Sequence, residues 1–169
     1  FFICFPYFIC FPGHNFKTSK STIRVYDISA PQNPVYLSTQ AVMWGNDIES
    51  LFIYNDKLFI GSPLAVFIYS LSNPSSPSYI SRFSHVRRCD PVVVSGNYAY
   101  STLRGGGDCG GSISELSVIN ISNISSPYLS KSYPMNDPYG IGLDNNMLFV
   151  CDGKSGLKIY DITATPNLT

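Results

Sequence analysis

The chain has 169 residues, of which 44% are hydrophobic and 13% charged, and its 11 Lys and Arg residues balance 11 Asp and Glu residues. A neutral chain lacks the positive field that binding to a phosphate backbone needs, so nucleic acid is not expected as a partner. The hydrophobic content allows one buried core, and 12 prolines with 13 glycines are typical of short strands joined by turns.

The first twelve residues are apolar and allow two interpretations. They are too short to span a bilayer and Pro6 and Pro12 interrupt them, so no transmembrane segment is expected. They could be the core of a signal peptide. They could also be a strand, because Phe8–Gly13 aligns with Phe149–Gly153 in the repeat described below. We favour the strand, as the second strand of a first blade, and assign residues 1–20 to a truncated blade.

A sequence unit recurs along the rest of the chain. Its most regular element, IYDI, places equivalent residues at Tyr26, Tyr69, Ile119 and Tyr160, at intervals of 43, 50 and 41 residues. The longest interval contains the glycine-rich insert Arg104–Gly111, so the underlying period is near 42. Apolar runs separated by Asn-Asp, Gly-Asn and Asn-Asn pairs indicate strands and hairpin turns. A period of about 40–45 residues is typical of propeller blades.

The fold class that follows is all-β: a β-propeller, or a partial arc of one, with four-stranded antiparallel blades over residues 21–169. We expect about three to four blades, the last of them truncated. The predicted strands are Ile23–Ile28 and Val35–Thr39; Ile48–Tyr54, Lys57–Gly61, Ala65–Leu71 and Ser78–Arg82; Pro91–Ser95, Tyr98–Leu103, Ile113–Ile121 and Tyr128–Ser132; Tyr139–Leu143, Met147–Cys151 and Leu157–Ile162.

These strands are apolar on both faces, which predicts that each blade is covered on both sides by its neighbours. Five tyrosines are therefore expected to pack between blades and not to bind a ligand: Tyr54, Tyr69, Tyr98, Tyr100 and Tyr160.

The segments Cys89–Gly111 and Tyr133–Ile162, with the NPSSP-type turns, resemble the LVIVD-repeat family of bacterial β-propeller proteins. The resemblance extends over roughly Ser21 to Asn167. It implies a propeller fold, a secreted or cell-surface location and no defined catalytic activity. Because the chain begins at Phe1 and ends inside the fourth blade, we expect it to be a fragment of a larger ring.

The chain has five cysteines, and the predicted fold brings two of them together. Cys89 ends the loop into blade three, and Cys109 lies in the loop between the second and third strands of that blade. Both loops open on one face of a propeller, so a Cys89–Cys109 disulfide is expected in an oxidising compartment. Cys151 is expected to be a buried, unpaired thiol, and Cys4 and Cys10 have no assignable partner. With two histidines and no CxxC pair, no metal site or other cofactor is expected.

Three aspartates, Asp47, Asp90 and Asp137, occupy equivalent positions before the first strand of a blade. They could form a ring at the channel mouth that binds a cation or a polar ligand. They could instead cap their own turns, and this interpretation is favoured where proline follows the aspartate.

Loops of the same face carry Trp44, His85, Arg87, Arg88 and Arg104. Trp and Arg are common anchors of binding surfaces, although an ordinary solvated rim would have similar residues. The function favoured is a non-catalytic binding or scaffold module, secreted or on the cell surface, whose partner is an unknown protein or glycan of the cell envelope. The alternative is a propeller enzyme of hydrolase or lyase type with its site at the channel mouth.

Overall fold

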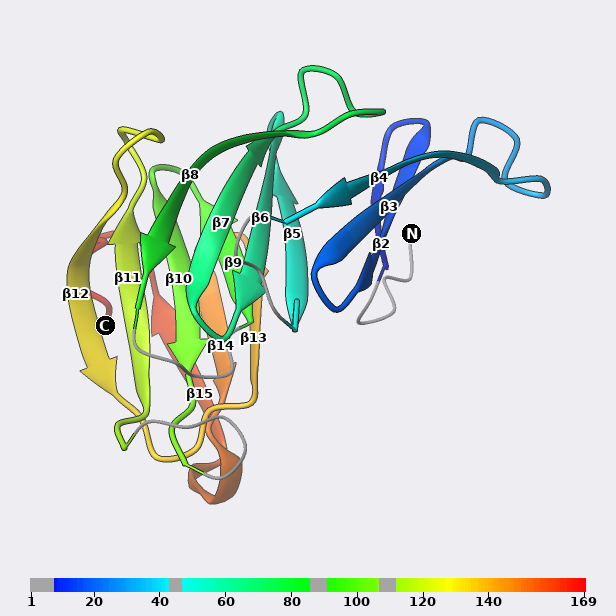
Figure 1. Ribbon diagram of the computed structural model, residues 1–169. Coiled ribbons are helices and arrows are strands. Elements are labelled where there is room, and N and C mark those ends of the chain that lie inside the picture. Colours follow the sequence, from blue (N-terminus) through cyan, green and yellow to red (C-terminus); the bar gives the residue numbers. More distant parts are fainter. Residues whose placement is uncertain (1–7, 43–46, 86–90, 107–111) are drawn as a thin grey trace.

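The computed structural model describes residues 8–42, 47–85, 91–106 and 112–169, which form four antiparallel sheets (Figure 1). Each sheet is built from consecutive strands of the chain, so the sequence repeat and the structural repeat coincide. The predicted all-β class is confirmed, and the strand boundaries from Ser21 onward agree with the prediction to within two residues. In the described ranges, no helix is both long and apolar enough to cross a membrane.

Blade one has four strands: β1 (Phe8–Phe11), β2 (His14–Ser19), β3 (Thr22–Asp27) and β4 (Val35–Ala41). Phe8–Phe11 is a strand, as expected, but it is the first strand of the blade and not the second. Gly13, with φ of 72°, turns the chain back into β2, which holds the second position. The sequence HNFKTS was missed as a strand because it is mostly polar, although Phe16 at its centre is fully buried.

Blades two and three are complete. Blade two consists of β5 (Ser50–Tyr54), β6 (Lys57–Ser62), β7 (Ala65–Ser70) and β8 (Ser78–Ser84), and blade three of β9 (Val92–Ser95), β10 (Tyr98–Leu103), β11 (Glu115–Asn120) and β12 (Tyr128–Pro134). The hairpins between first and second strands turn at Asn55 (φ 53°) and Gly96 (φ 58°), residue types that tolerate the left-handed region.

Blade four has three strands, β13 (Gly140–Asp144), β14 (Met147–Cys151) and β15 (Leu157–Asp161), with a short 3-10 turn, η2 (Gly153–Ser155), between the last two. Thr169 lies beside Asp161, and the Asp161 N–H donates to the Thr169 carbonyl over 2.8 Å. This is the position at which the fourth strand begins in the other blades.

The repeat is also visible in the turn that follows each third strand. Asp27 accepts a hydrogen bond from the Ser29 N–H at 2.8 Å, and Asp161 accepts one from the Thr163 N–H at 2.7 Å. These backbone hydrogen bonds hold the pKa of both carboxyls below the ordinary aspartate value. The aspartate of the IYDI unit therefore fixes the chain reversal into the outer strand.

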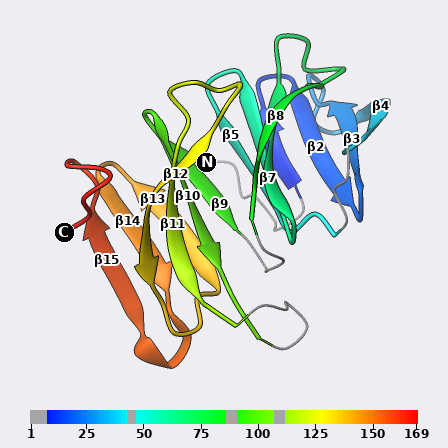
Figure 2. The same ribbon diagram turned by 60° about the vertical axis from the view of Figure 1, so that its left-hand side comes forward.

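The four sheets stand side by side in chain order, from blade one to blade four (Figure 2). Contacts between neighbouring sheets concentrate on the first strands, β1, β5, β9 and β13, which therefore lie nearest the common centre. Apolar clusters fill each of the three spaces between blades. The tyrosine prediction is confirmed: Tyr69 and Tyr100 are buried in these clusters, and Tyr54, Tyr98 and Tyr160 pack against them.

Candidate binding face

Loops that enter a blade lie beside the loop that joins the second and third strands of the preceding blade. The Ile48 N–H, entering blade two, donates to the Lys20 carbonyl at 2.8 Å, and the His85 N–H donates to the Leu64 carbonyl at 3.2 Å. We call this side the loop face. Its described residues are 20–21, 47–49, 63–64, 85, 104–106, 135–139 and 152–156.

Four of the residues predicted for this face are described: Asp47, His85, Arg104 and Asp137. The others lie outside the described residues and stay predictions: Trp44, Arg87, Arg88 and Asp90, together with the cysteine pair Cys89 and Cys109.

Arg104 forms the clearest contact between blades on this face. Its guanidinium carbon lies 4.2 Å from the centroid of the Tyr139 ring, a cation–π geometry. Arg104 follows the second strand of blade three, whereas Tyr139 directly precedes the first strand of blade four and is 57% exposed. The structure therefore places Arg104, which was predicted for the binding face, against the ring of Tyr139, which the sequence analysis had assigned to the first strand of blade four.

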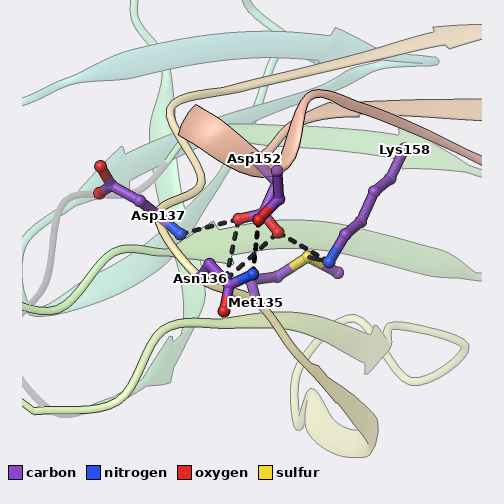
Figure 3. A network of polar contacts seen from close by, with 6 residues as sticks. Met135, Asn136, Asp137, Asp152 and Lys158 are labelled. Carbon is purple, nitrogen blue, oxygen red and sulfur yellow. Dashed lines mark hydrogen bonds and ion pairs between the residues drawn. The ribbon is translucent and has the colours of Figure 1, made fainter.

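Asp47 and Asp137 lie at different blade seams. Asp47 is exposed, has φ of 55°, and lines a shallow hollow of 370 Å³ with Lys20, Ile48 and Glu49 at the seam of blades one and two. Asp137 is half-buried at the seam of blades three and four, and its carboxylate points away from that of Asp152 in Figure 3.

A buried aspartate that the sequence analysis did not select holds the loop into blade four. Asp152 is fully buried, and its carboxylate accepts hydrogen bonds from the N–H groups of Asn136 at 2.9 Å and Asp137 at 2.8 Å. Lys158 Nζ lies 2.7 Å from the same carboxylate and 3.7 Å from Met135 Sδ (Figure 3). The side chain of Asp152 thus ties residues 135–137 to the loop between β14 and β15.

The charge state of Asp152 follows from these contacts. Burial alone would raise the pKa of this carboxyl, but the Lys158 ammonium and the two backbone N–H donors outweigh burial and hold the pKa below its ordinary value. Asp152 is therefore ionised at neutral pH and pairs with Lys158, whose side chain is 30% exposed. Such a pair makes the loop rigid, because moving it would leave a buried charge without a partner.

Gly153 gives a first test of this rigid loop. Its φ is 53°, and a Cβ there would lie 3.0 Å from the Cβ of Asp137. We expect Gly153→Ala to lower the free energy of unfolding by about 1–2 kcal/mol, measured by urea unfolding. Gly142→Ala, where a Cβ meets nothing within 4 Å, is the matched control and should have no such cost. An equal effect of the two changes would contradict this account of the loop.

A second hollow, of 330 Å³, lies at the other end of the seam between blades three and four. Its described lining is Ser95, Gly96, Asn97, Tyr98, Tyr100, Asn146, Ile162, Thr163 and Thr165. The Tyr100 hydroxyl is hydrogen-bonded to Thr165 Oγ1 at 2.8 Å, and burial raises the pKa of this phenol. Sequence reasoning had assigned these tyrosines to packing alone, because a repeat pattern shows which residues face a seam but not where the seam opens.

Cys151 corrects one prediction. It is unpaired, as expected, but it is exposed and not buried. The apolar run at the end of β14 predicted burial, but Cys151 belongs to the side of blade four that no further described blade covers. In the part of the chain that the structure describes, no group of three His, Cys, Asp or Glu residues is placed to hold a metal ion.

Four fanned antiparallel sheets with their first strands at the centre define a β-propeller-type repeat fold. The model of the LVIVD repeat matches residues 87–107 and 110–134. No curated protein matches the sequence.

Solved structures share the fold at low sequence identity. The computationally designed Ika4 protein is similar with a TM-score of 0.64 and 15% identity, covering 89% of this chain and 86% of that one. The N-terminal domain of Nup159 is similar with a TM-score of 0.60 and 12% identity, covering 94% of this chain and 40% of that one. Hsv2 of Kluyveromyces lactis is similar with a TM-score of 0.56 and 9% identity, covering 90% of this chain and 43% of that one. The chain therefore spans less than half the length of the latter two chains.

Proposed function

We propose that the protein is a non-catalytic binding or scaffold module that meets its partner through the loop face at the seam of blades three and four. The propeller-like repeat fold indicates a binding or scaffold module in general terms. The Arg104–Tyr139 pair carries the more specific proposal. It joins a cation and a largely exposed aromatic ring, two groups that often dominate binding energy.

The surroundings of this pair favour recognition because they are already ordered. Tyr139 follows the loop that Asp152 fixes, so its ring does not have to be immobilised when a partner binds. A planar guanidinium stacked on a tyrosine ring suits a partner that offers carboxylates or a sugar ring. A protein or glycan of the cell envelope fits this chemistry.

The binding proposal predicts a specific loss. Arg104→Ala is expected to weaken binding about tenfold or more to whichever ligand wild type captures from defined panels of envelope glycans and surface proteins, measured by biolayer interferometry. Lys131→Ala is the matched control, because Lys131 lies 5.0 Å from the Tyr133 ring on β12 and away from the loop face. Wild type that binds nothing in the panels, or Arg104→Ala that binds as well as wild type, would contradict the proposal.

We further propose an extracytoplasmic location, which the resemblance to LVIVD-repeat proteins supports and which would allow the predicted Cys89–Cys109 disulfide to form. The loop between these cysteines closes 20 residues, for which a disulfide stabilises by about 3 kcal/mol. Trypsin cuts after Arg104 and separates the two cysteines. Without reductant, a cross-linked pair of peptides is therefore expected in mass spectra of secreted material. Two free thiols in that material would refute the pairing.

A further inference from the structure

The second hollow lies where blade three meets blade four, at the end of the strands opposite the loop face. Its volume is 330 Å³, which is within the range of small-ligand sites, and both of its walls belong to blades that pack against each other in the structure. The hairpins between the first and second strands of the two blades border it at Asn97 and Asn146. Residues of the turn after the third strand of blade four complete the lining. We call it the hairpin hollow.

Blade three has a small residue here, at a position where blade two has a tyrosine. Tyr54 pairs with Lys57 and Ser95 pairs with Tyr98, so Tyr54 and Ser95 are equivalent residues of the repeat. The Tyr54 ring packs against the cluster between blades two and three, and its hydroxyl accepts a hydrogen bond from the Gly96 N–H at 2.9 Å, across the seam. Ser95 lines the hairpin hollow and is too short to fill the corresponding space against blade four.

Two side-chain amides of the hairpin hollow are available to a ligand. Asn97 and Asn146 are exposed, and neither side chain hydrogen-bonds to another residue of the described ranges. Their backbone carbonyls accept hydrogen bonds from the N–H groups of Ile121 and Ile162, each at 2.9 Å, so both amides extend from an ordered backbone. A side-chain amide has both donors and an acceptor. The hollow therefore offers hydrogen-bonding groups that need little ordering when a ligand binds.

The composition of the lining restricts the class of ligand. Among the described residues that line the hairpin hollow there is no charged side chain, and the polar groups are hydroxyls and amides. An anion would find no cationic side chain there, and a metal ion would find no carboxylate. A purely apolar ligand would cover the amides without replacing their hydrogen bonds to water. Tyr98 adds a half-buried aromatic ring. An uncharged ring with several hydroxyl groups and an apolar C–H face fits this lining.

We propose that the hairpin hollow is a second binding site, which takes an uncharged sugar ring. The amides of Asn97 and Asn146 hydrogen-bond to the hydroxyl groups of the sugar, and its C–H face packs against Tyr98. The hollow and the loop face lie at opposite ends of the seam of blades three and four, and they share no residue. The proposal therefore does not depend on the loop face being a binding surface.

Ser95→Tyr tests the proposal because it introduces the side chain that blade two has at this position. In saturation-transfer difference NMR, wild type should bind at least one of the methyl glycosides of glucose, galactose and mannose, with a Kd of about 1–10 mM. Ser95→Tyr should abolish this binding and should keep a free energy of unfolding, measured in urea, at least as high as that of wild type. Ser126→Tyr is the matched control, because Ser126 is an exposed serine of blade three outside the hollow, and it should bind like wild type.

Asn146→Ala is a second variant in case Ser95→Tyr does not fold, and it should raise the Kd about fivefold or more. Maltose, lactose and mannobiose distinguish the source of the sugar: a second ring that is tolerated indicates the end of a glycan, and one that abolishes binding indicates a free monosaccharide. Methyl glucuronide should bind more weakly than methyl glucoside, because its carboxylate finds no cation in the lining.

Three results would overturn the proposal: no saturation transfer to any of the three glycosides, wild-type binding by both Ser95→Tyr and Asn146→Ala, or tighter binding of the glucuronide than of the glucoside. Arg104→Ala should bind the glycosides like wild type. Failure of the loop-face proposal and failure of this one therefore give different results.

Discussion

Asp152→Ala is expected to lower the free energy of unfolding by about 3 kcal/mol. The change removes the acceptor of the Asn136 and Asp137 N–H groups and leaves Lys158 without its partner at 2.7 Å. The released loop is the one that places Tyr139 against Arg104, so binding through the loop face should weaken as well. Urea unfolding followed by circular dichroism measures the stability change.

Two comparisons separate this effect from a general loss of charge. Asp144→Ala removes an exposed aspartate of the same blade and should change stability by no more than about 0.5 kcal/mol. Lys158→Met should cost less than Asp152→Ala, because the carboxylate keeps its two backbone donors. If Asp144→Ala and Asp152→Ala were equally costly, the buried network would not be what holds the loop.

The same carboxylate predicts a pH dependence. Its pKa in the folded protein lies below the ordinary value of 3.8, so ionised Asp152 stabilises the fold above that pH. This contribution is lost as the pH falls from 3.8 through the lower folded-state pKa. The stability advantage of wild type over Asp152→Asn should therefore be constant from about pH 7 to 5 and shrink below about pH 4. An advantage that does not change with pH would rule out the ionised state.

The recurrence of IYDI was sufficient to predict the fold, because the aspartate caps a turn and the tyrosine position fixes the register of a whole blade. The strand β2 was missed because hydropathy alone identifies a strand poorly when most of its residues are polar, although Phe16 and Thr18 are buried in it. Burial was predicted correctly where a blade lies between two neighbouring blades. The predictions failed for blade one and blade four, the first and last of the described blades. Cys151 illustrates the second case.

The candidate site was predicted only in part, because its contacts join residues that are far apart in the sequence. The loop face and Arg104 follow from topology, since equivalent loops must lie on one side. Asp152 lies in a turn-like stretch, CDGKSG, and nothing local distinguishes it from a solvated turn residue. Its role depends on a loop some 15 residues earlier, whose approach is set by the pairing of β13 with β14.

Ile68 and Ile159 offer a direct comparison of a covered and an uncovered blade face. They are the same residue type at the same repeat position, but Ile68 is 1% exposed and Ile159 is 51% exposed. We expect Ile68→Ala to lower the free energy of unfolding by about 2–4 kcal/mol, because it opens a cavity in the cluster shared by blades two and three. Ile159→Ala should cost less than about 1 kcal/mol, because about half of its side chain is already exposed.

Urea unfolding followed by circular dichroism measures both costs. A cost for Ile159→Ala as large as that for Ile68→Ala would contradict the exposure of the Ile159 side chain.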